Sequence, residues 1–239
     1  MRWQKKKISE NKLENLIPPI LIWKEAVKKN IKMNYDKKVQ LLIIGDSGVG
    51  KTSILLKYVD NFFTDQHIAT IGVEYKTKVI TKGKYKISLN IWDTAGQERF
   101  KSITKSFFSN TNAIIFVYDI TKRESFSGSS GVKNWIKDSE EYGKFDRILC
   151  GNKLDLEAKR KVTTDELKEY GIKKKIDVFE TSAKNGHNIN QIFDKLIDII
   201  INSRSEDELI REFGVKSKSR GTTLSKKKSG KAQKQGCCK

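Results

Sequence analysis

The feature that most constrains this chain is a short glycine-rich segment, GDSGVGKT over residues 45–52, which fits the pattern G-x-x-x-x-G-K-[ST]. An apolar stretch, Val39–Ile44, comes directly before it, and apolar residues at helical spacing follow it. Glycines let backbone N–H groups turn inward around a phosphate chain, and the helix that follows presents its positive N-terminus to the anion. Because both flanking elements are present, a chance glycine-rich turn is the weaker interpretation, and the segment predicts a nucleotide phosphate site.

Residue types within the segment assign roles at that site. Lys51 can reach the β- and γ-phosphates, and the Thr52 hydroxyl can ligate Mg²⁺. We expect the phosphates to contact Ser47, Gly48, Val49, Gly50, Lys51, Thr52 and Ser53.

Strand-like and helix-like segments alternate along the chain. We predict strands at 39–44, 73–81, 85–92, 113–119, 148–151 and 178–181, and helices after residue 52, over 132–142, from 163 to a stop at Gly171, and over 189–201. The second and third strands read as a hairpin around Lys82-Gly83-Lys84. This alternation predicts an α/β fold, a six-stranded mostly parallel sheet with one antiparallel strand pair and helices on both faces.

The net charge of +19 lies mainly at the two ends of the chain. Residues 1–38 hold 11 Lys/Arg and 4 Asp/Glu, and residues 214–239 hold 9 Lys/Arg and no acidic residue, which leaves +3 for the middle. We therefore predict three parts: a flexible basic N-terminal extension over 1–36, a domain over 37–203, and a flexible basic tail over 204–239. Charge in extensions does not indicate a nucleic-acid-binding face, and no recognition motif accompanies it.

The apolar runs, the N-terminal region and the cysteines together suggest a cytoplasmic protein. No apolar run reaches the roughly 18–20 residues of a membrane span, and the N-terminal region is a poor signal peptide. Residues 20–32 either form a basic amphipathic helix, suited to an anionic membrane or a partner, or are a weakly structured leader before Met33; the second interpretation is favoured. One lone cysteine and an adjacent pair, Cys237 and Cys238, make no disulfide framework or zinc spacing.

A second motif, DTAGQ over residues 93–97, directly follows a predicted strand. A carboxylate at the carboxyl end of that strand lies beside the phosphate site, so Asp93 is predicted to hold the metal rather than only to cap the strand. Gly96 is placed to bring its N–H to the γ-phosphate, Gln97 to orient the attacking water, and Thr70 to close over Mg²⁺ and the γ-phosphate.

A third motif, NKLD over residues 152–155, predicts the choice of base. Guanine presents N1–H and the N2 amine side by side, and the Asp155 carboxylate can accept both, whereas adenine cannot donate there. Asn152 would contact N7 and brace the loops, and the Lys153 stem would cover the ring. The remaining base contacts are expected from Ser182, Ala183 and Lys184, with the Ala183 N–H toward O6. Phe63 would pack on the other side of the base; the alternative interpretation is that it contacts the core.

These motifs in this order resemble those of the small Ras-like GTPases. The sequence around and between them, such as IGVEY at 71–75 and NIWDTAGQERF at 90–100, is most similar to the Rab family. The resemblance implies the P-loop small GTPase fold, with its six-stranded sheet and five helices, and a monomer. It also implies Mg²⁺ as cofactor and GTP and GDP as substrate and product, with Gln97 and Lys51 catalytic and Thr52, Thr70 and Asp93 at the metal. It also implies an exchange factor, a GTPase-activating protein, effectors and a lipid-binding carrier. Geranylgeranyl groups on Cys237 and Cys238 would hold the protein on the cytosolic face of endomembranes or the plasma membrane; the alternative is an inert thiol pair.

The chain departs from the family at two places. FFSN at 107–110 stands where a Tyr-Tyr-Arg-Gly-type segment is usual, which leaves the effector set open. The Gly/Ser-rich stretch 127–131 looks like a short insertion, which we expect to form a looser loop far from the nucleotide. A binding module without turnover is the alternative function, and the presence of Gln97, Thr70, Lys51 and Thr52 argues against it.

Overall fold

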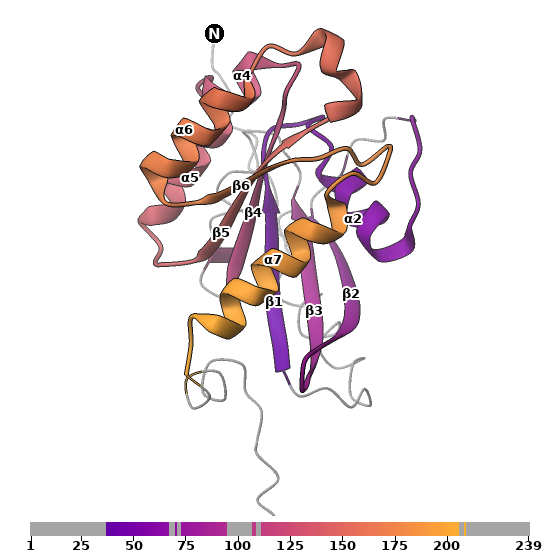
Figure 1. Ribbon diagram of the computed structural model, residues 1–239, viewed down its shortest axis with the longest axis vertical. Coiled ribbons are helices and arrows are strands. Elements are labelled where there is room, and N and C mark those ends of the chain that lie inside the picture. The colour runs from indigo at the N-terminus through magenta and orange to yellow at the C-terminus, as the bar shows by residue number, and fades with distance from the viewer. Residues whose placement is uncertain are drawn as a thin grey trace, which may run out of the picture.

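The structure, a computed structural model, describes residues 37–66, 70, 73–94, 107–108, 111–205 and 208. These residues form a six-stranded sheet with helices on both faces (Figure 1). The strand order is β2-β3-β1-β4-β5-β6, in which β2 and β3 are antiparallel and all other neighbours are parallel. The strands are β1 (Lys37–Ile44), β2 (Val73–Lys82), β3 (Tyr85–Thr94), β4 (Ala113–Asp119), β5 (Asp146–Asn152) and β6 (Asp177–Glu180).

Five α-helices occur in the described part of the chain, which confirms the expected fold class. They are α2 (Lys51–Asp60), α4 (Arg123–Ser127), α5 (Val132–Glu140), α6 (Thr164–Lys174) and α7 (Ile189–Asn202), and a 3₁₀ helix, η4 (Leu154–Lys159), follows β5. Helices α2 and α7 lie on one face of the sheet, and α4, α5 and α6 lie on the other (Figure 1). None of the helices described here has the length and apolar character needed to cross a membrane.

Strand β1 fixes the phosphate loop to the centre of the core. Leu41 and Ile43 pack toward α2 and α7, while Leu42 and Ile44 pack toward α4, α5 and α6, and all four are fully buried. These four residues lie where the strand is buried on both faces, which is why this part of the sequence is apolar without alternation. The loop at its carboxyl end therefore starts from a rigid position.

The start of α6 is confirmed by its capping geometry. The Thr163 hydroxyl accepts a hydrogen bond from the Glu166 N–H, and the Glu166 carboxylate accepts one from the Thr163 N–H, which is a complete capping box. Arg123 of α4 also donates to Glu166, with Nη2 2.5 Å from Oε1. Arg123 and the Thr163 N–H together lower the pKa of Glu166 to about 2. The bonds from Arg123 tie α6 to α4.

The predicted helix stop at Gly171 is wrong, because α6 continues to Lys174. Gly171 is buried, and a Cβ at this position would lie 2.4 Å from Cγ1 of Val178 on β6. The glycine thus allows α6 to pack closely on the sheet. The helix ends at Lys175, whose left-handed backbone (φ 54°) directs its N–H to the carbonyls of Gly171 and Ile172.

The expectation of a looser loop at 127–131, far from the nucleotide site, is also wrong. Nδ2 of Asn134 donates to the carbonyls of Gly128 and Ser129, each at 2.9 Å, and these bonds hold the turn in place. The Ser130 hydroxyl donates to Oδ2 of Asp46 at 3.2 Å. The turn therefore contacts the phosphate loop itself, because it joins α4 and α5 at the end of the sheet where β1 ends.

Most other element limits agree with expectation to within two residues, although α4 and η4 were not predicted. The N-terminal extension and the tail beyond Glu208 lie outside the described residues, as does the cysteine pair. The division into three parts stays a prediction.

Gly171→Ala tests the packing role of this glycine. In a helix, alanine is normally more stable than glycine by about 1 kcal/mol. Here we expect the free energy of unfolding to fall by about 1–3 kcal/mol instead, because the added Cβ overpacks against Val178. The measurement is urea denaturation in a fixed excess of GDP. Lys168→Ala, on the exposed side of the same helix, is the control and should stay within about 0.5 kcal/mol. A more stable Gly171→Ala variant would contradict the close packing.

Candidate functional site

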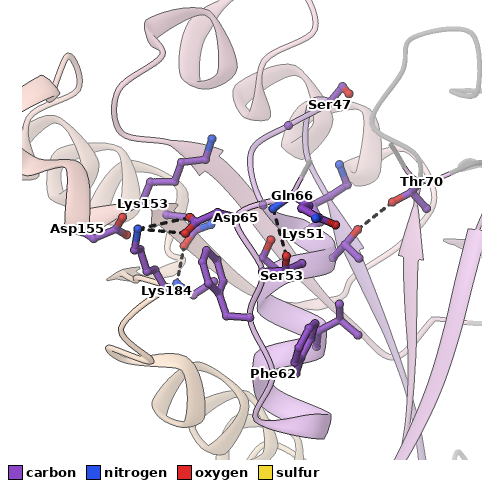
Figure 2. Close-up of a pocket in the computed structure, with 18 of the residues that line it drawn as sticks. Ser47, Lys51, Ser53, Phe62, Asp65, Gln66, Thr70, Lys153, Asp155 and Lys184 are labelled. Carbon is purple, nitrogen blue, oxygen red and sulfur yellow. Dashed lines mark hydrogen bonds and ion pairs between the residues drawn. The ribbon is translucent and has the colours of Figure 1, made fainter. Parts of the chain in front are cut away.

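A cavity of about 550 Å³ opens at the carboxyl end of the sheet, a size in the ordinary range for ligand sites. Its walls come from the phosphate loop and the first turn of α2, from residues 62–66 with Thr70, and from the loops after β5 and β6 (Figure 2). This is the edge at which open α/β sheets bind ligands. The segments that were predicted separately from sequence therefore meet around one cavity.

The phosphate loop needs its glycines for close backbone approach. A Cβ on Gly45 would lie 2.0 Å from the carbonyl oxygen of Val117 on β4. Gly50 has φ 98° at the start of α2, and a Cβ there would lie 2.3 Å from Nδ2 of Asn152. The Val49 side chain is buried in the core, so it is the backbone of this residue that belongs to the site.

Lys51 lies at the start of α2 and points into the cavity (Figure 2). Its side chain is only 5% exposed, and Nζ donates to the carbonyl oxygen of Asp46 at 2.8 Å. Burial lowers the pKa of Lys51 to about 8, and the nearby carboxylates of Asp93 and Asp46 oppose that shift. The site thus holds a desolvated ammonium group that an anion would stabilise.

Three oxygen-bearing side chains meet beside Lys51. The hydroxyls of Thr52 and Thr70 lie 2.8 Å apart, and the Thr52 hydroxyl donates to Oδ2 of Asp93 (Figure 2 shows the contact with Thr70). Asp93 is fully buried, and among the described residues its Oδ1 has no hydrogen-bond partner. Burial raises the pKa of Asp93 to about 6, against the effects of Thr52 and Lys51. Hard oxygen donors around an unpartnered carboxylate oxygen fit Mg²⁺, which in nucleotide sites takes one or two carboxylates and substrate phosphates.

The opposite end of the cavity carries the residues predicted to bind the base. Oδ1 of Asp155 accepts a hydrogen bond of 2.5 Å from the Ser182 hydroxyl, which orients this carboxylate. Lys153 has a left-handed backbone (φ 71°), and its Nζ lies 2.7 Å from Oδ2 of Asp119. This ion pair fixes the far end of the Lys153 side chain, while the residue itself lines the cavity.

Asn152 joins the loops to one another and is almost fully buried. Its Nδ2 donates to the Val49 carbonyl at 2.9 Å, and its Oδ1 accepts from the Thr181 hydroxyl at 3.2 Å and the Ala183 N–H at 3.3 Å. The predicted bracing role thus has a direct counterpart in the structure. In this arrangement the Ala183 N–H bonds to Asn152, whereas the sequence placed it toward the base.

Phe63 both lines the cavity and packs against the core, so its two interpretations are compatible. Sequence reasoning missed Asp65, which lies at the cavity mouth with its carboxylate 3.4 Å from Nζ of Lys184 (Figure 2). It also missed Phe62 and Leu156, which line the cavity and are exposed. The only signal for Phe62 was its position next to Phe63.

Two of the predicted residues, Gly96 and Gln97, lie outside the described residues. The structure brings the other predicted nucleotide residues to the cavity or directly behind it. Those that line it are Ser47, Gly48, Gly50, Lys51, Thr52, Ser53, Phe63, Thr70, Asn152, Lys153, Asp155, Ala183 and Lys184. Val49, Asp93 and Ser182 support it through the contacts given above.

The sequence of this chain is similar to those of known proteins. Residues 40–202 match the family model described as Ras family. The chain is 41% identical over 182 residues to Ras-related protein Rab-3C of Mus musculus, covering 75% of this chain and 78% of the relative. It is 40% identical to Ras-related protein Rab-13 of Canis lupus familiaris, covering 80% and 91%, and 37% identical to Ras-related protein RABE1e of Arabidopsis thaliana, covering 87% and 95%.

The chain belongs to the Ras family of small GTPases. Within this family it is a Rab protein, a GTP hydrolase that binds GTP and GDP and acts in vesicle trafficking with regulators and effectors. The resemblance found in the motifs is confirmed, and the binding module without turnover is not favoured.

Asn152→Ala tests the brace between the loops. The substitution leaves the Val49 carbonyl, the Thr181 hydroxyl and the Ala183 N–H without their partner. Each unpaired buried group costs about 1–3 kcal/mol, and losses at one site are not additive, so we expect the free energy of unfolding to fall by about 2–5 kcal/mol. Thermal or urea denaturation with equal GDP measures it. Asn185→Ala, an exposed asparagine in the neighbouring loop, should change the value little, and equal losses in both variants would rule out a bracing role.

Proposed function

We propose that the cavity is the GTP and GDP site, with the phosphates at the Lys51 end and guanine at the Asp155 end. The observation that supports this most directly is the placement of these two residues in one cavity, from elements about 100 residues apart. Ser47, Gly48 and Gly50 and the first turn of α2 line the same cavity and offer backbone N–H groups to the phosphates. The ammonium of Lys51 exchanges its bond to the Asp46 carbonyl for the β- and γ-phosphates.

At the base end, the proposed specificity comes from a carboxylate that is already oriented. Ser182 donates to one oxygen of Asp155, and the carboxylate has capacity left for the two N–H groups of guanine. Adenine has no N–H groups at these positions and would leave the remaining acceptor capacity of Asp155 unfilled. Phe63 and the Lys153 stem would enclose the ring, and Asn152 would keep the phosphate and base subsites at a fixed separation.

For the metal, we propose that Thr52, Thr70 and Asp93 hold Mg²⁺ together with phosphate oxygens. When bound, Mg²⁺ would offset negative charge on the β- and γ-phosphates. The hydroxyl of Thr52 already lies between Thr70 and Asp93, so the described residues need little rearrangement to present oxygens to a cation. Thr70 would contact the γ-phosphate, which GTP has and GDP lacks. This difference in contacts between the two nucleotides is the proposed basis of the switch.

Hydrolysis in this proposal depends on positioning. Gln97 orients a water molecule toward the γ-phosphate, and Gly96 donates its N–H to that phosphate. Lys51 stabilises the charge on the transferred group. The motifs offer no arginine aimed at the γ-phosphate, so intrinsic turnover is slow and a GTPase-activating protein accelerates it.

We further propose that Cys237 and Cys238 carry prenyl groups that hold the protein on cytosolic membrane faces. A single lipid chain gives only marginal, reversible binding, so two chains are the number suited to stable anchoring. The lysines of the tail would add roughly 1 kcal/mol each near an anionic leaflet. An exchange factor, a GTPase-activating protein and a lipid-binding carrier are the partners that such a cycle requires.

Asp155→Ala tests the base assignment. In the unmutated protein we expect GTP and GDP to bind about 10⁴–10⁵-fold more tightly than ATP, because a site built for N–H donors rejects an analogue that lacks them. Asp155→Ala should lose most of this ratio, as measured by competition against a fluorescent GDP analogue. Asp177→Ala, a carboxylate at the opposite end of the sheet, should leave the ratio unchanged. Comparable ATP and GTP affinities in the unmutated protein would refute the assignment.

The lipid anchor is tested at the C-terminal peptide. Mass spectrometry of this peptide from native cells should show two prenyl groups, and a Cys237→Ser/Cys238→Ser double variant should move from the membrane to the soluble fraction. Variants with one serine serve as controls for the number of chains. An unmodified peptide, or a double variant that stays on membranes as fully as the unmutated protein, would remove the anchor from this proposal.

A further inference from the structure

We propose that Ser130, in the turn between α4 and α5, is a positioning residue for the phosphate loop and slows the release of GDP. The inference rests on the proposed function of the cavity as a guanine-nucleotide site. It concerns the stretch 127–131, which departs from the family pattern in sequence and which none of the nucleotide motifs includes.

The turn touches the nucleotide site through one side chain. The Ser130 hydroxyl donates to Oδ2 of Asp46 at 3.2 Å, across 84 residues of sequence. Asp46 is the second residue of the phosphate loop, and its carbonyl oxygen accepts from Nζ of Lys51. The contact therefore acts on the residue that holds the ammonium group expected to bind the phosphates.

The backbone around Ser130 is built to hold its position. Nδ2 of Asn134 donates to the carbonyls of Gly128 and Ser129, and the Gly131 N–H donates to the Gly128 carbonyl at 3.0 Å. A Cβ at Gly128 or Gly131 would lie 2.5 or 2.6 Å from the carbonyl oxygen of Glu124, so both glycines let the turn pack directly on α4. The place of the hydroxyl is thus fixed by several independent contacts.

The bond to Ser130 has an electrostatic consequence. Burial lowers the pKa of Lys51, whose ammonium group is proposed to bind the phosphates, and the carboxylate of Asp46 opposes that shift. A carboxylate near phosphates repels them, and a hydroxyl that donates to it both orients it and partly balances its charge. Loss of the hydroxyl should therefore weaken the phosphate loop's grip on GDP.

The expected effect is modest because the one hydrogen bond that is removed, at 3.2 Å, is longer than is usual between two oxygens. A net contribution typical of such bonds corresponds to a two- to tenfold change in a rate or equilibrium constant. We expect Ser130→Ala to release GDP about two- to tenfold faster than the unmutated protein. Asn134→Ala should shift the rate in the same direction, because it frees the turn without removing the hydroxyl.

The experiment measures release of a fluorescent GDP analogue from the full chain in the presence of Mg²⁺, with ³¹P NMR of bound GDP as a second readout. Ser129→Ala removes an exposed hydroxyl from the same turn and is the matched control. Ser130→Thr keeps a donor and should restore the rate. Only the variants that lose or displace the donor should move the β-phosphate resonance, because stability alone does not act on the phosphate environment.

Two results would overturn the inference: release from Ser130→Ala at the unmutated rate, or equal acceleration in Ser129→Ala and Ser130→Ala. Both leave the proposed function intact as long as the unmutated protein retains GDP. Failure of the unmutated protein to bind GDP would instead overturn the proposed function, so the two failures are distinguishable.

Discussion

The whole site depends on the hydrogen bonds of the Asn152 side chain. It lies at the end of β5 and joins the Val49 carbonyl to Thr181 and Ala183, so one amide connects three loops from different parts of the chain. Asn152 is almost fully buried, and a buried polar group that loses its partner is costly. Gly50 has no Cβ to interfere with this amide. The separation between the Lys51 end and the Asp155 end of the cavity is therefore set by covalent geometry and by these hydrogen bonds.

The second constraint is electrostatic. Lys51 and Asp93 are both buried beside the cavity, and burial lowers the pKa of the first and raises that of the second. Two desolvated charges without full hydrogen bonding cost stability. Phosphates at Lys51 and a cation at Asp93 would compensate these costs, so ligand binding and folding should reinforce each other. A switch also depends on ligand binding. Two ligands shift the conformation of the loops differently only if they make different contacts with the site.

The sequence predicted the fold and most of the site because phosphate and base motifs sit at strand ends, where a parallel sheet brings them together. The buried strand before residue 45 and the hairpin at Gly83 also follow from local patterns. The same local reasoning failed at Gly171, since a glycine needed for tertiary packing looks like a helix stop. It failed at Ser130 and Asp65 for a related reason: their contacts to Asp46 and Lys184 join residues 84 and 119 positions apart, and no local pattern encodes such pairs.

We propose above all that one cavity binds a guanine nucleotide together with a divalent cation through Lys51, Thr52 and Asp93. The most direct test is a calorimetric titration of GDP into the nucleotide-free full chain, once in millimolar Mg²⁺ and once in excess chelator. We expect Mg²⁺ to tighten GDP binding at least about tenfold, a gain of about 1.4 kcal/mol. Equal affinity under the two conditions would contradict it, because the oxygen cluster at Asp93 would then have no part in holding the nucleotide.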